Sequence, residues 1–170
     1  GEEGASRTTD RFVLSDANIN GTATIDGGAY YAGASGTYAA SNLANADVLE
    51  ARNASVVTLG DLAGLSNIGT LEFTNDTAVV QNSVLQLNDT ILDALVNSSK
   101  AAVSAAAVAP AVPSVERMTI HGLDNNVVGG AVTGLNLDAS AVSDKFAIDV
   151  LLGRGLNSVV ATAGADRIVE

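Results

Sequence analysis

The chain has 170 residues, enough for one large domain with a real core, and its 19 acidic against 8 basic residues give a formal net charge of -11. Such an acidic surface repels nucleic acid and anionic lipid, so we expect neither as a partner. Nearly half of the residues are hydrophobic, but Trp and Cys are absent and only three Phe and three Tyr occur. This composition excludes disulfides as a source of stability and favours thin, repetitive stacking of small apolar side chains.

The ends and hydropathy of the chain bear on its location. No apolar run reaches the roughly 18 residues needed to cross a bilayer, so we expect no membrane insertion. The start, GEEGASRTTD, lacks the basic residues and apolar core of a secretory signal, and we expect it to be the cut end of a longer chain.

The first half of the chain is predicted to be strands interrupted by one loop. Residues 10–28 have the pattern strand, turn, strand, with Asn20-Gly21 as a hairpin signal. Strand patterns return over residues 47–75 and 79–87. Between them, residues 29–46 form a predicted loop insertion of Gly, Ala and Ser that holds all three tyrosines, Tyr30, Tyr31 and Tyr38. These tyrosines either bind a sugar ring or a protein partner, or pack the loop against the body.

One amphipathic helix is predicted after residue 88. Asn88 or Asp89 can cap the segment TILDALVNSS, in which the apolar side chains share one face. Those side chains are Ile91, Leu92, Leu95 and Val96. We expect this helix to cover one end or side of the core. The Ala- and Pro-rich stretch that follows, up to residue 113, either lengthens the helix or forms a surface excursion.

The tail, residues 132–169, predicts four short strands closed by turn residues. Their centres lie near Leu137, Ile148, Val159 and Ile168, about ten residues apart. Within the second strand, one face carries Phe146, Ile148, Val150 and Leu152. The regular spacing predicts a mainly β fold over residues 1–170 as a single domain, a solenoid like a parallel β-helix or β-roll, with a β-sandwich as the alternative.

Catalytic signals are weak. His121 is the only histidine, and no serine lies in a G-x-S-x-G turn. The carboxylates are scattered over turns, and the chain lacks the aromatic cleft that polysaccharide-cleaving enzymes usually offer. We therefore expect no catalytic residue, with His121 as a half-exposed strand residue.

A calcium signal is stronger. The β-roll repeat GGxGxDxUx uses glycines for tight turns and an Asp as ligand. Gly164–Ile168 matches its G-x-D-x-U half, Asn45–Leu49 is the same half with Asn for Gly, and Gly27-Gly28 supply a detached first half. Candidate calcium ligands are Asp26, Asp47, Asp138, Asp144 and Asp166. The alternative for each is that it caps a turn through nearby backbone.

Three segments carry a family resemblance: NIGTLEF, VERMTI, and GLNLDASAVSDKFAIDVLLGRGLNSVVATAGADRIV. They resemble segments that flank the glycine-rich calcium repeats of RTX-type secreted bacterial proteins, above all large adhesins and surface-layer proteins. The likeness covers roughly residues 45–75 and 115–169, although consecutive intact repeats are missing. It implies one-step (type I) secretion, an extracellular or cell-surface location, and Ca²⁺ as the ordering cofactor.

These observations predict a non-enzymatic structural module of a secreted, calcium-dependent surface assembly, whether a surface layer, a filament or an adhesin. The expected partners are further copies or neighbouring domains of the same surface protein. The alternative is a glycan- or protein-binding module of an adhesin that uses the tyrosine loop. A polysaccharide-acting enzyme on a β-helix is the third hypothesis.

Overall fold

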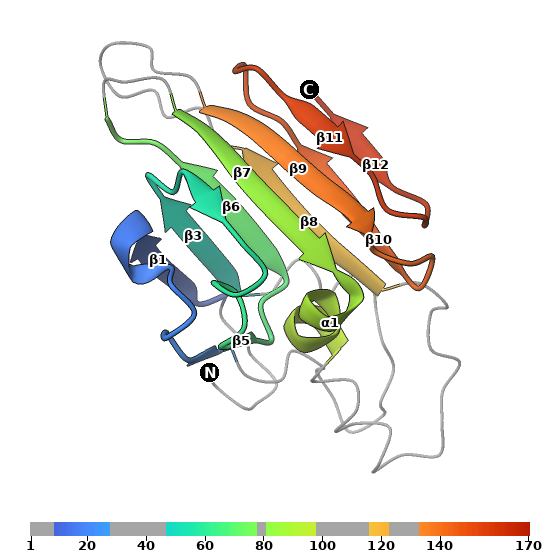
Figure 1. Cartoon of the computed structure of the whole chain (residues 1–170), viewed down its shortest axis with the longest axis horizontal. Coiled ribbons are helices and arrows are strands. Elements are labelled where there is room, and N and C mark those ends of the chain that lie inside the picture. Colours follow the sequence, from blue (N-terminus) through green and yellow to red (C-terminus); the bar gives the residue numbers. More distant parts are fainter. Residues whose placement is uncertain (1–8, 28–46, 78–80, 98–115, 123–132) are drawn as a thin grey trace.

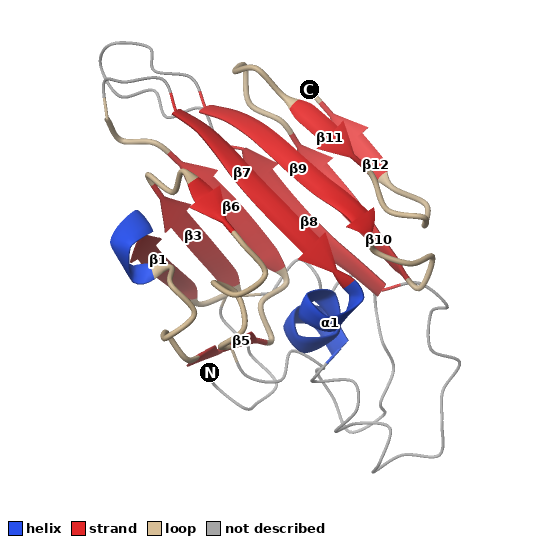
Figure 2. Cartoon of the chain, viewed as in Figure 1, coloured by secondary structure: helices blue, strands red, loops and turns tan. Residues whose placement is uncertain are grey.

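Two parallel sheets make up most of the chain in its computed structural model, which describes residues 9–27, 47–77, 81–97, 116–122 and 133–170 (Figures 1 and 2). The larger sheet has six strands in the order β1-β3-β6-β8-β10-β12. Their bounds are Arg11–Ser15, Val48–Arg52, Thr70–Thr74, Glu116–Gly122, Phe146–Leu151 and Arg167–Val169.

The second sheet has four strands in the order β11-β9-β7-β4. Their bounds are Ser158–Val160, Thr133–Ala141, Gln81–Asn88 and Val56–Val57. Figure 1 shows these strands as a layer in front of the six-stranded sheet. A small third sheet pairs β2 (Ile25–Asp26) with β5 (Leu65–Ser66).

From β6 onward the chain alternates between the two large sheets, and each strand pairs with the strand from the preceding pass. Every described pairing is parallel. A β-sandwich, the alternative from the sequence, has antiparallel neighbours joined by hairpins. The mainly β, parallel character is therefore confirmed.

Inward-facing side chains of the two sheets form one apolar core. Successive strands contribute residues at the same register position, as in the row Leu49, Leu71, Ile120 and Val150. Each of these side chains is buried. Leu85 and Leu137 occupy matching positions in the four-stranded sheet and are also buried. Stacked rows of medium-sized apolar residues explain how the chain builds a core with few aromatics.

The hairpin prediction at Asn20-Gly21 is wrong. Strand β1 pairs with β3, whereas β2 pairs with β5, so the turn connects two different sheets. Gly21 has a positive φ of 73°, and Asn20 Oδ1 accepts hydrogen bonds from the backbone N–H and hydroxyl of Thr22. The Asn-Gly pair correctly predicts a tight turn, but β2, the strand that follows it, belongs to a different sheet from β1.

The predicted helix is confirmed at its start. Helix α1 (Asp89–Leu92) follows β7 directly, and the Asn88 side chain accepts a hydrogen bond from the Ile91 N–H. A π-helical turn, Asp93–Asn97, continues it. All four predicted stripe residues are buried, and this helical segment contacts β5, β7 and β8. Figure 1 shows α1 at the end of β7, where it covers one end of the core. No described helix has the length and apolarity that a membrane span needs.

The four strands predicted in the tail are also confirmed as β9, β10, β11 and β12. In β10 the expected inward side chains Phe146, Ile148 and Val150 are buried. Leu152 lies just past the end of this strand and packs half-buried against the core.

Candidate functional site

The two aspartates of the calcium half-motifs make the same contact. Asp47 immediately precedes β3, and its Oδ1 accepts a 2.8 Å hydrogen bond from the backbone N–H of Asp10, beside it on the β1 side. Asp166 immediately precedes β12, and its Oδ1 accepts a 2.9 Å hydrogen bond from the backbone N–H of Ile148 in β10. Each carboxylate therefore joins the start of its own strand to the preceding strand of the six-stranded sheet.

The rest of the GADRI half-motif also has a structural role. The Thr162 backbone N–H donates to Asp166 Oδ2 and the Thr162 hydroxyl to Asp166 Oδ1, both at 2.7 Å, so both carboxylate oxygens accept hydrogen bonds. A Cβ at Gly164 would lie 2.1 Å from the Phe146 carbonyl oxygen, which only glycine avoids. The motif residues thus hold a close approach between two successive strands.

Gly27, from the detached first half of the other repeat, lies next to Asp47 of its second half. Gly27 donates its N–H to the Ser66 carbonyl, and a Cβ there would lie 2.5 Å from Asp47 Oδ2. Residues 28–46 intervene in the sequence, as the hypothesis of an insertion into one repeat requires. Residues 28 and 45–46 of this pattern lie outside the described part of the chain.

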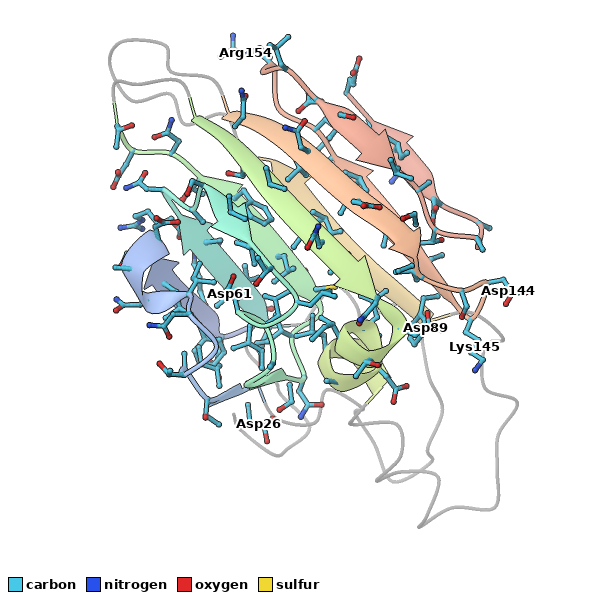
Figure 3. All side chains as sticks on the ribbon, in the orientation of Figure 1. Asp26, Asp61, Asp89, Asp144, Lys145 and Arg154 are labelled. Atoms are coloured by element: carbon cyan, nitrogen blue, oxygen red, sulfur yellow. The ribbon has the colours of Figure 1, made fainter. Side chains whose placement is uncertain are left out.

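The other three candidate aspartates lie apart. Asp26 accepts a hydrogen bond from the Asn67 side-chain amide. Asp138 closes a local turn, and hydrogen bonds from the Ser140 hydroxyl and backbone N–H hold the pKa of Asp138 below its ordinary value. Asp144 is an exposed turn residue between β9 and β10. Figure 3 shows Asp26 and Asp144 far apart, at the lower and the right-hand edge of the molecule.

Among the described residues, no group of three or more His, Asp or Glu side chains could hold a metal ion. The five candidates are therefore not brought together there, and calcium binding stays a prediction. The tyrosines Tyr30, Tyr31 and Tyr38 lie outside the described residues, as does the stretch 98–115 after the helix.

Polar side chains at the turns repeat the behaviour of Asp47 and Asp166. Asp16 Oδ1 accepts a 2.9 Å hydrogen bond from the Ser55 N–H, 39 residues away in sequence. Asp89 Oδ1 accepts a 2.7 Å hydrogen bond from the Ser143 N–H, which lowers the pKa of Asp89. Further contacts of this kind join Asn157 to Leu135, Asn53 to Asp76 and Asn67 to Asp26. We call these contacts, together with those of Asp47 and Asp166, the corner bridges, because each joins segments from successive passes of the chain.

An ionic cluster lies on the outer face of the six-stranded sheet. Glu50 is 4% exposed and accepts hydrogen bonds from Arg11, Arg52 and the Thr74 hydroxyl. Burial acts to raise the pKa of the Glu50 carboxyl, but the hydrogen bonds from its three donors outweigh burial and lower that pKa to about 2. Arg11 also pairs with Glu72, which aligns with Glu50 in the next strand.

Sequence reasoning missed this cluster, although a signal for it exists. The segments VLEAR and TLEFT carry Glu at the same position, and pairing them in register places the two carboxylates side by side. Arg11 comes from a strand 39 residues before Glu50. Only the pairing of β1 with β3 shows that this arginine neutralises both acids.

His121 extends the cluster on β8. Its Nδ1 lies 3.5 Å from Glu72 Oε1, and its side chain is 28% exposed. A surface hollow of about 330 Å³ begins beside it and crosses β8, β10 and β12. Residues that line this hollow include Thr119, His121, Asp149, Leu151, Arg167 and Val169. The arrangement combines charged groups, a hydroxyl and apolar side chains on one face of the sheet.

Comparison with known proteins adds no relative: no family model, no curated protein and no solved structure matches the chain.

Proposed function

We propose that the chain is a non-enzymatic structural module of a secreted bacterial surface assembly, whether a surface layer, a filament or an adhesin. We further propose that its parallel strands are successive turns of a β-solenoid. The alternation between two parallel sheets, with each strand beside the strand of the preceding pass, supports this architecture. The resemblance to segments that flank RTX repeats supports the extracellular location.

The corner bridges carry the structural part of the proposal. A catalytic or ligand site needs polar groups that converge and stay available to a substrate. Here Asp16, Asp89 and Asp166 instead accept backbone N–H groups of neighbouring passes. The donors at Ser55 and Ser143 lie in turns and the one at Ile148 lies in β10, next to residue 166, where β12 has not yet begun. The acidic residues thus act mainly as connectors within a stack.

The calcium dependence is a separate part of the proposal. Both oxygens of Asp166 accept hydrogen bonds, and Oδ1 of Asp47 accepts one. At Asp166 a calcium ion would have to compete with the N–H and O–H donors that both carboxylate oxygens already accept. The calcium dependence is tested separately, by the melting temperature in millimolar calcium and in chelator.

Stability measurements on matched variants test the structural role. We expect Asp16→Ala and Asp89→Ala each to lower the free energy of unfolding by about 1–2 kcal/mol, because a backbone donor loses its partner. The control is Asp144→Ala, which removes an exposed turn aspartate and should change stability by less than about 0.5 kcal/mol. Sedimentation velocity over a concentration series then measures assembly. A protein that stays monomeric at every concentration, with or without calcium, and whose bridge variants match the control would overturn the proposal.

A second candidate, glycan binding, is favoured by the hollow beside His121. Its volume of about 330 Å³ suits one sugar ring, with Thr119 and Asp149 available for hydroxyl groups and Leu151 for an apolar ring face. A glycan array on the parent protein and on Arg167→Ala tests it. Specific binding that is lost in Arg167→Ala supports this candidate, and an array without signal removes it.

A further inference from the structure

The turn that leads into β2 contains the one Asn-Gly pair in the sequence, Asn20-Gly21. An asparagine followed by glycine reacts with its own backbone when the amide nitrogen of the glycine attacks the side-chain carbon Cγ and closes a cyclic imide. The reaction requires a side chain that is folded towards the next peptide, an N–H group that is neither hindered nor engaged, and access for water. Each of these conditions is met in this turn.

Hydrogen bonds hold the Asn20 side chain in an Asx turn. Asn20 Oδ1 accepts the Thr22 backbone N–H at 3.1 Å and the Thr22 hydroxyl at 2.6 Å. Such a turn folds the side-chain amide back over the peptide that follows it. Negative charge develops on Oδ1 when the ring closes, so the two donors stabilise that charge as an oxyanion hole does. The Asn20 Nδ2 donates to the Ala17 carbonyl at 3.2 Å, and this bond breaks when ammonia leaves.

Gly21 presents the attacking nitrogen without obstruction. Among the described residues, none accepts a hydrogen bond from the Gly21 N–H. The φ of Gly21 is 73°, and a Cβ there would lie 2.4 Å from the Gly60 carbonyl oxygen, so the fold requires glycine at this position. The same requirement keeps side-chain atoms away from the reacting nitrogen. Asn20 and Thr22 are both exposed, so water reaches the site.

A second turn has the same two hydrogen bonds but lacks the other conditions. Asn75 Oδ1 accepts the N–H and the hydroxyl of Thr77 at 3.0 and 2.7 Å. Asn75 is only 1% exposed, however, and the N–H of the next residue, Asp76, donates to Asn53 Oδ1 at 3.0 Å. There the attacking nitrogen is engaged, it carries a neighbouring side chain, and water is excluded from the asparagine. Asn75 is therefore an internal control for Asn20.

We propose that Asn20 is a site of covalent self-modification in the folded protein, which converts it to isoaspartate and aspartate. The Gly21 nitrogen loses its proton to hydroxide and bonds to Asn20 Cγ. The Cγ–Nδ2 bond breaks, and Nδ2 takes a proton from solvent and leaves as ammonia. Water then opens the imide at either carbonyl, and opening at the backbone carbonyl leaves isoaspartate. One water is consumed and one ammonia is released, so the reaction needs no oxidant or reductant.

The modification changes both the charge and the backbone of this turn. Either product adds a negative charge to a chain whose formal net charge is already -11, and isoaspartate also lengthens the backbone by one methylene group. Because Gly21 lies against Gly60 without room for a further carbon, the longer backbone loosens this contact. We expect the isoaspartate form, separated by ion exchange, to melt at a lower temperature than the unmodified protein. Equal melting temperatures would overturn this part of the proposal.

Incubation of the purified chain at mildly alkaline pH in ¹⁸O-labelled water tests the reaction itself, and the label marks modification that occurs during the incubation. Peptide mapping by mass spectrometry should show labelled isoaspartate at residue 20 and unmodified Asn75. Asn20→Gln is the control that should abolish the signal at residue 20. A synthetic peptide of residues 15–25, which has the pair without the fixed turn, is the reference. If the peptide reacts fully while residue 20 of the protein stays intact, the fold protects Asn20 and the proposal is wrong. Aspartate without isoaspartate would also overturn it, because water would then attack Cγ directly.

Substitutions of the exposed Thr22 test the contribution of the turn. Thr22→Val removes the hydroxyl donor and keeps the N–H, so it should slow isoaspartate formation in the protein about tenfold, the effect of one hydrogen bond to the developing charge. Thr22→Ser, which keeps the hydroxyl, should react like the parent protein. In the peptide Thr22→Val should have little effect, because the turn is not fixed there. Equal rates for the Thr22→Val and parent proteins would contradict the assistance by the turn.

Discussion

Residues 47–77 and 151–170 contain the same kind of short strand but differ in burial. Strand β3 in the first stretch has a neighbour on each side, β1 and β6, and its residues Leu49 and Ala51 are buried. Strand β12 in the second has only β10 among the described strands, and no residue from 151 to 170 is buried. The local sequence specifies a strand in both places, whereas the number of neighbouring strands decides how much that strand stabilises the fold.

The largest expected difference between the two stretches is in the core. Phe73 is 1% exposed between strands on both sides, and Phe73→Ala should lower the free energy of unfolding by about 3–5 kcal/mol. Ile168→Ala, at the edge, should cost less than about 1 kcal/mol, because the side chain is already partly in water. Urea denaturation of both variants measures this contrast. Equal losses would show that the side chain in β12 is as well covered as the one in β6.

The ionic cluster gives the first stretch a pH dependence. The pKa of Glu50 in the folded protein is about 2, below its ordinary value of 4.5. The folded state therefore binds fewer protons there than the unfolded state between these values. The stabilisation is complete above about pH 4.5 and is lost as the pH falls towards 2, and it amounts to about 3 kcal/mol at neutral pH.

Glu50→Gln tests this effect. The variant should be less stable at pH 7, and the gap from the parent protein should narrow steadily between pH 4.5 and 2. Asp144→Asn, which removes one exposed carboxylate, controls for the change in net charge. A gap of constant size across this range would mean that ionisation of Glu50 does not contribute to stability.

Asp47 and Asp166 allow the two stretches to be compared at one equivalent hydrogen bond. Asp47 is 2% exposed and Asp166 is half-buried, yet each accepts one strand-to-strand N–H bond. We expect Asp47→Ala to cost about 2–3 kcal/mol and Asp166→Ala about 1 kcal/mol, since an unpaired donor costs more where water is excluded. Denaturation curves for both, with Asp138→Ala as a control for loss of a local turn bond, measure the difference. A larger loss at Asp166 would reverse the proposed order.

The sequence predicted the features that nearby residues determine, and it missed those that depend on residues far along the chain. The strands of the tail and the cap of α1 follow from patterns within about ten residues, such as the alternation of Phe146, Ile148 and Val150. Which strand pairs with which does not follow from such patterns. The Asn20-Gly21 turn has the composition of a hairpin turn. The strands on its two sides nevertheless enter different sheets, because β1 pairs with β3 and β2 pairs with β5, and both partners lie far along the chain.

The candidate site shows the same limit. The sequence identified Asp47 and Asp166 as equivalent, and the structure gives them equivalent contacts. Their partners, Asp10 and Ile148, could be found only once the register was known. The same holds for Glu50, whose two arginines come from different strands. Spacing along one segment predicts an element, but charge pairing across elements requires the topology.

The smallest expected effect on stability is at Leu156, in the turn between β10 and β11. This side chain is 81% exposed, so Leu156→Ser should change the free energy of unfolding by less than about 0.5 kcal/mol. The same change removes an exposed apolar group from the surface, and it should lower light scattering at high protein concentration. Urea curves and static light scattering measure the two effects on one sample. A loss above about 1 kcal/mol would mean that other residues of the folded chain cover Leu156. The number of neighbouring strands would then not explain why residues 151–170 are less buried than residues 47–77.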